Sequence, residues 1–118
     1  MHELSVCQGL ISQVEQIARR EDAESVTRIL LSVGPLSGVE PQLLADAFPI
    51  AAAGTVAEHA RLDIESQPIR VKCDTCGAET DASANRLLCG SCGDFRTRLV
   101  SGDEMLLMSL ELERRERA

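Results

Sequence analysis

The segments Cys73-Asp-Thr-Cys76-Gly77 and Cys89-Gly-Ser-Cys92-Gly93 are two copies of the same short motif, C-x-x-C-G. Zn²⁺ takes four donors near the corners of a tetrahedron, and a tight C-x-x-C turn presents two sulfurs to one ion. The Gly after each pair can adopt a positive φ, which lets backbone N–H groups reach the sulfurs. The pattern therefore predicts a zinc site made by Cys73, Cys76, Cys89 and Cys92.

Two other interpretations use the same cysteines. A single C-x-x-C pair is also typical of thiol–disulfide chemistry, but two pairs with matching glycines favour a metal. Iron–sulfur ligation uses the same ligands and stays a minor alternative. Because four thiolates leave no open position on zinc, we expect the ion to be structural and not catalytic. The fifth cysteine, Cys7, is expected to be a small buried hydrophobe.

Apolar periodicity predicts the elements around this motif. Apolar residues recur at helical spacing over 4–20, and a second helix is expected from Pro41 to about Gly54, with a kink or a restart at Pro49. Strands are predicted at 25–33, 60–65 and 104–113. This order predicts an α+β fold in which two helices pack on a small three-stranded sheet.

The predicted domains follow from the same order. The cysteine-rich segment 72–94 has little periodic apolar pattern and is expected to form a zinc-ribbon-like module inserted into the chain. Residues 1–71 and 95–118 would then form the α/β body.

Composition and charge limit the partners. The chain has 118 residues, a formal net charge of −7, two Phe and no Trp or Tyr. An acidic protein without aromatic stacking residues is a poor binder of nucleic acid. No apolar run approaches a membrane span and no signal peptide precedes the first helix, so we expect a cytoplasmic protein without a membrane partner. Self-association into a homo-oligomer stays open.

The amino terminus, Met1-His2-Glu3, offers a second metal site. One amine, the amide nitrogens of residues 2 and 3, and the His2 imidazole can approach one ion in a plane, which suits Ni²⁺ or Cu²⁺. Taken alone this signal is weak, because a histidine near a terminus is common by chance. His59 is expected to be a solvated residue in the turn before a strand.

Several segments together resemble the HypA/HybF family of hydrogenase maturation nickel metallochaperones. They are Met1-His2-Glu3-Leu4, Val33-Gly34-Pro35-Leu36-Ser37-Gly38-Val39, Ala47-Phe48, Gly54-Thr55, the two cysteine pairs, and Ser101-Gly102-Asp103-Glu104. The cysteine pairs alone occur in many zinc proteins, but their combination with the initial Met-His-Glu and the Gly-x-Leu-Ser-Gly loop is specific. The chain departs from the family pattern at two positions. Pro49 interrupts a segment expected to be continuous helix, and Gly90 stands where the family often has Pro.

The resemblance implies delivery of nickel to the large subunit of a nickel–iron hydrogenase, together with a GTPase accessory protein. It implies that His2 is the principal nickel ligand, that Met1 and Glu3 supply backbone nitrogens, and that nickel is cargo while zinc is structural. Delivery to urease occurs in some relatives. A zinc-ribbon adaptor that binds protein without nickel is the alternative. A zinc enzyme is disfavoured because the sequence has only two histidines and no H-E-x-x-H motif.

Overall fold

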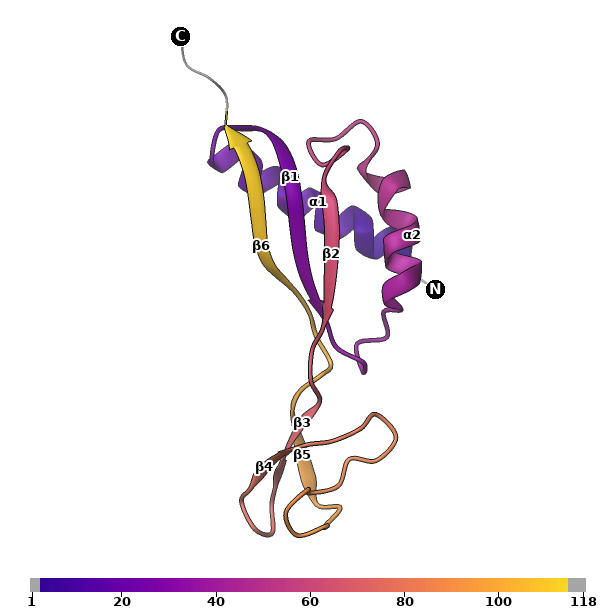
Figure 1. Cartoon of the computed structure of the whole chain (residues 1–118), viewed down its shortest axis with the longest axis vertical. Helices are drawn as coiled ribbons and strands as arrows, with labels where there is room; N and C mark the ends of the chain where they lie inside the picture. The colour runs from indigo at the N-terminus through magenta and orange to yellow at the C-terminus, as the bar shows by residue number, and fades with distance from the viewer. Residues whose placement is uncertain (1–2, 115–118) are drawn as a thin grey trace. The chain divides into compact units, whose positions relative to one another are not determined.

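The computed structural model describes residues 3–114, which form two helices and six strands. These are α1 (Glu3–Arg20), β1 (Ala23–Val33), α2 (Pro41–Ala52), β2 (Arg61–Ser66), β3 (Arg70–Cys73), β4 (Glu79–Asp81), β5 (Thr97–Ser101) and β6 (Met105–Arg114) (Figure 1). The strands form two three-stranded sheets, in the orders β2-β1-β6 and β4-β3-β5. The chain divides into two compact units. The first takes its described residues from 3–31, 39–64 and 107–114, and the second comprises 32–38 and 65–106.

The first helix of the first unit is amphipathic, as its sequence predicts. Its buried residues recur every three or four positions and are Cys7, Leu10, Ile11, Val14 and Ala18. Leu4 lies on the same predicted face but is 42% exposed, because it sits in the first turn of the helix. Cys7 is fully buried and its Sγ lies 3.5 Å from the Leu44 carbonyl oxygen of α2, so the prediction of a small buried hydrophobe is confirmed.

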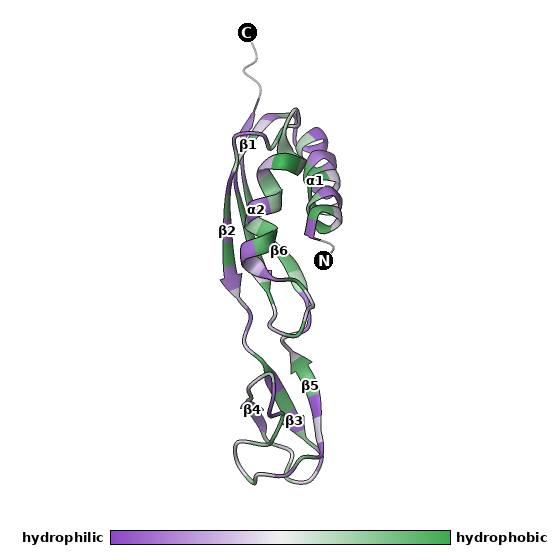
Figure 2. Ribbon diagram, turned by 90° about the vertical axis from the view of Figure 1, so that its right-hand side faces the viewer, coloured by the Kyte–Doolittle hydropathy of each residue, from purple (hydrophilic) through white to green (hydrophobic). Residues whose placement is uncertain are grey.

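The second helix begins at Pro41 and buries Leu44, Phe48 and Ala52 against the rest of the unit. It continues past Pro49 to Ala52, so the expected restart does not occur. Pro49 is exposed, and it has no N–H group to donate to the carbonyl four residues earlier in the helix. Figure 2 shows hydrophobic and hydrophilic residues alternating along both helices. Within residues 3–114, no helix is both long enough and apolar enough to cross a membrane.

The three strands of the first sheet are the three that apolar patterning predicts. β1 is central, β2 runs parallel to it after the α2 crossover, and β6 runs antiparallel on the other side (Figure 1). Ile29 and Leu31 of β1 are fully buried, whereas Thr27, two positions before Ile29, is exposed. The α+β prediction of two helices with a three-stranded sheet is confirmed.

The second unit contains a close backbone contact between two distant segments. Gly34 donates a hydrogen bond to the Glu104 carbonyl at 2.8 Å, and Leu36 donates one to the Gly102 carbonyl at 2.8 Å. A Cβ atom on Gly34 would lie 2.2 Å from the Gly102 carbonyl oxygen, and Gly102 itself has φ 114°. These two glycines therefore allow a backbone approach that no larger residue permits.

The second sheet was not predicted from the sequence. β3 is central and pairs antiparallel with β4 and β5, with Lys72 opposite Glu79 and Cys73 opposite Thr97. The strands are short and partly polar, so they carry no period-two apolar signal. Among their residues only Val71 and Cys73 are buried.

Replacement of Gly34 by alanine tests the close backbone contact. We expect Gly34→Ala to lower the free energy of unfolding by about 3 kcal/mol, because the new Cβ meets backbone atoms that cannot rotate away. Gly9→Ala is the matched control: nothing lies within 4 Å of its Cβ position, and alanine favours the helix. Urea unfolding of the two variants measures the difference. Equal or greater stability of Gly34→Ala would contradict the contact.

Candidate metal centre

The first C-x-x-C-G motif is held at the turn of the β3–β4 hairpin. Gly77 has φ 77°, and its N–H donates to the Cys73 carbonyl at 3.0 Å. The chain can therefore curl so that the N–H groups of Thr75 and Cys76 point at the Cys73 sulfur, at 3.3 and 3.4 Å. The predicted role of the glycine is confirmed here.

The second motif repeats this geometry in the segment before β5. Gly93 has φ 80° and donates to the Cys89 carbonyl at 2.9 Å. The N–H groups of Ser91 and Cys92 lie 3.3 and 3.4 Å from the Cys89 sulfur. The two motifs are thus structural copies of each other, as their sequences suggest.

The four cysteine sulfurs meet in one cluster. All four lie within 4.8 Å of one another, and the Cys73–Cys92 and Cys76–Cys89 Sγ pairs are each 3.6 Å apart. A tetrahedron with metal–sulfur bonds of about 2.3 Å has edges of about 3.8 Å, close to the observed spacing. The cluster is therefore a four-cysteine metal site whose donors and geometry fit a structural zinc ion.

Polar contacts outside the cysteines join the two motifs. The Thr75 hydroxyl donates to the Asp94 carboxylate at 2.7 Å, which lowers the pKa of Asp94 with further help from the Arg96 N–H. Arg98 of β5 bonds Asp74 at 2.8 Å. Sequence reasoning did not find these residues, because nothing in their spacing marks them as partners.

Gly90, the departure from the family pattern, has a specific partner. Its N–H donates to the Thr80 hydroxyl at 2.8 Å, and a Cβ atom on it would lie 3.1 Å from the Thr80 Cβ. A proline at this position lacks that N–H group. Thr80 of β4 therefore accounts for glycine at this point of the second motif.

The two cysteines of each motif differ in environment. Cys73 and Cys89 are buried, whereas Cys76 and Cys92 are exposed. The Cys92 and Ser91 N–H groups lower the pKa of Cys89 to about 6. The Cys76 and Thr75 N–H groups likewise lower the pKa of Cys73.

The pKa of the exposed Cys92 moves the other way. An N–H bond from Asp94 lowers it, but contact with Cys73, burial, and contact with Cys76 and Cys89 raise it to about 12. Four neighbouring sulfurs cannot all carry charge without a cation among them. A divalent ion supplies the charge that makes a full set of thiolates stable.

The predicted nickel ligands Met1 and His2 lie outside the described residues. Glu3 is the first described residue and begins α1. His59 is 92% exposed beside Glu58 in the loop before β2, which confirms the prediction of a solvated residue.

Two helices, a mixed sheet and a four-cysteine cluster define a small metal-binding α+β protein. A family model described as "Hydrogenase/urease nickel incorporation, metallochaperone, hypA" matches residues 1–112. The chain belongs to this family of nickel metallochaperones for hydrogenase maturation.

Individual relatives agree with this assignment. The chain is 51% identical to the hydrogenase maturation factor HypA of Nitrosospira multiformis over 112 residues, which cover 95% of this chain and 97% of the relative. It is 46% identical to the Aquifex aeolicus factor over 113 residues, covering 96% and 98%. The solution structure of the Ni metallochaperone HypA from Helicobacter pylori matches with a TM-score of 0.73 at 27% identity, covering 98% of this chain and 100% of that one.

Removal of one cluster cysteine tests the metal site. We expect the wild-type protein to hold about one zinc per chain through four sulfurs, and Cys73→Ser to lose tight binding together with the order of the β3–β4–β5 sheet. Cys7→Ala, which removes the cysteine outside the cluster, should keep the zinc. Elemental analysis and X-ray absorption measure the content and the donors. Oxygen or nitrogen ligands in the wild-type spectrum would contradict the four-cysteine site.

Proposed function

We propose that this protein binds Ni(II) at its amino terminus and delivers it to the large subunit of a nickel–iron hydrogenase during maturation. Membership of the nickel metallochaperone family, with a match that starts at residue 1, is the observation that carries the proposal. His2 supplies the imidazole, and Met1 and Glu3 supply the amine and amide nitrogens. These donors favour the square-planar geometry common for Ni(II).

Cys73, Cys76, Cys89 and Cys92 hold a structural Zn²⁺ in this proposal. Every donor position on the zinc is a protein thiolate, so this ion stays with the protein while nickel is transferred. The buried core of the β4-β3-β5 sheet is small, with only Val71 and Cys73 buried in its strands, and metal binding then contributes directly to its folding.

The proposed partners are a GTPase accessory protein of hydrogenase maturation and the hydrogenase large-subunit precursor, in the cytoplasm. Support for them comes from the family, whose relatives are named as hydrogenase maturation factors. A reducing compartment also keeps the four thiols available for the metal.

Replacement of His2 separates the two metals. We expect His2→Ala to abolish tight nickel binding, because it removes the only side-chain donor of the proposed site, while zinc content and thermal unfolding stay near wild type. His59→Ala is the matched control and should keep full nickel binding, because His59 is exposed in a loop. Nickel titration by calorimetry and hydrogenase activity in cells grown at limiting nickel measure the effects. Normal hydrogenase activity of the His2→Ala strain would overturn the proposal.

Extension of the amino terminus gives an independent test. A tag before Met1 turns the terminal amine into an amide and moves the ligand frame, so nickel binding should weaken by at least tenfold. The same tag after Ala118 should have no effect. Equal nickel affinity of the two tagged proteins would show that the terminal amine is not a ligand.

A further inference from the structure

Strand β6 is an edge strand of the first unit. In the order β2-β1-β6 it pairs with β1 on one side only, so its other side presents unpaired backbone groups along residues 107–114. Edge strands are usually protected by charge or proline. The opposite edge, β2, alternates Arg61, Asp63 and Glu65, whereas residues 107–110 of β6 read Leu-Met-Ser-Leu. The uncharged residues 107–110 therefore make β6 the less protected of the two edges.

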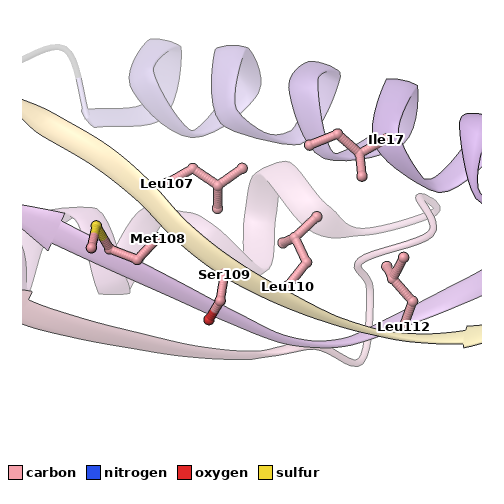
Figure 3. A pocket seen from close by; sticks show the side chains of 6 residues that line it. All are labelled: Ile17, Leu107, Met108, Ser109, Leu110 and Leu112. Carbon is pink, nitrogen blue, oxygen red and sulfur yellow. The ribbon is translucent and has the colours of Figure 1, made fainter.

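An apolar groove lies beside this edge. Ile17 of α1 and residues 107–110 and 112 of β6 line a space of about 330 Å³. Figure 3 shows Leu107, Leu110 and Leu112 directed toward the helix side, where Ile17 lies. Met108 is 51% exposed at the same strand. The groove can take apolar side chains from a strand laid along β6.

Acidic side chains flank the same strand. The side chain of Glu111 is 62% exposed and lies 4.0 Å from the Arg28 guanidinium. Arg28 makes a shorter contact, of 2.6 Å, to the Asp63 carboxylate. Glu113 accepts a hydrogen bond from the Ser25 hydroxyl at 3.4 Å and is exposed. Arg114, the last residue of β6, is paired with Glu21 at 2.8 Å. Glu111 thus shares Arg28 with Asp63 at the longer distance, and Glu113 makes no ion pair within residues 3–114.

We propose that the outer edge of β6 binds an extended segment of a partner protein that alternates apolar and basic residues. The backbone of the segment pairs with β6, its apolar side chains enter the groove beside Ile17, and its basic side chains face Glu111 and Glu113. Backbone pairing supplies affinity, while the groove and the two carboxylates select the sequence. The residues of this surface include none of the four cluster cysteines and none of the proposed nickel ligands.

A second copy of the chain fits the edge poorly. In the antiparallel self-pairing register that places Leu110 opposite Leu112, Glu111 of one copy lies opposite Glu111 of the other. Like charges directly opposite on a sheet destabilise the pairing, and each chain carries a net charge of −7. Charge complementarity therefore favours a basic partner.

A pair of synthetic peptides tests the proposal on the full-length, zinc-loaded protein. One is a capped decapeptide alternating valine and lysine, and the other alternates valine and glutamate. We expect the lysine peptide to bind at least tenfold tighter and to slow amide hydrogen exchange along residues 107–113. NMR of the labelled protein measures both effects, and sedimentation of the protein alone measures self-association.

Three variants sharpen this test. Met108→Lys should lower the affinity for the lysine peptide at least tenfold. Ile50→Lys is the control, at a 71% exposed apolar residue of α2, and should change this affinity less than twofold. The double variant Glu111→Lys, Glu113→Lys should reverse the preference toward the glutamate peptide. Equal binding of the two peptides, protection confined to other strands, or a β6-mediated dimer of the protein alone would overturn the proposal.

Discussion

The backbone contact between Gly34 and Gly102 fixes where three strands begin or end. Gly34 donates to the Glu104 carbonyl just before β6 begins, and Gln67, just after β2 ends, donates to the Val33 carbonyl at the end of β1. Only glycine at positions 34 and 102 lets the two segments approach this closely. A Cβ on Gly34 would meet the backbone of Gly102, and a Cβ on Gly102 would meet Ile69. The register of β1 with its neighbours therefore depends on two residues without side chains.

This contact also explains two segments that resemble the metallochaperone family. Val33–Val39 and Ser101–Glu104 are far apart in sequence, yet they bond directly, with Leu36 donating to the Gly102 carbonyl. Neither segment holds a metal ligand. Their similarity to the family thus reflects one structural requirement, the paired glycine backbones, and not two separate binding functions.

Elements with a strong apolar period were predictable, and the others were not. α1 and β1 start within two residues of their expected positions, since each buries a regular stripe against one core. β3, β4 and β5 were missed because what orders them is not an apolar stripe: Val71 is their one buried residue besides Cys73. α2 was predicted nearly to its end and continues through Pro49 without a restart, while the kink expected at this proline stays a prediction.

The four-cysteine cluster was predictable for a different reason, which is that its geometry is local. Each C-x-x-C-G turn fixes two sulfurs through N–H bonds from residues within three positions, so the motif alone carries the geometry. What joins the two turns is not local. Thr75 bonds Asp94, and Thr80 bonds Gly90, across segments whose proximity depends on the sheet. These contacts could not be read from spacing.

The same cluster limits where a transferable metal can bind. Among residues 3–114, Cys73, Cys76, Cys89 and Cys92 are the only group of three or more His, Cys, Asp or Glu side chains whose ligand atoms lie close enough to share an ion. A closed shell of four thiolates releases its ion only when a protein–metal bond breaks and the surrounding turns lose their order. Transfer of an ion from a folded carrier requires donors whose loss does not unfold the protein. The nickel site proposed above therefore uses backbone and imidazole nitrogens of residues 1–3 and none of the four cysteines.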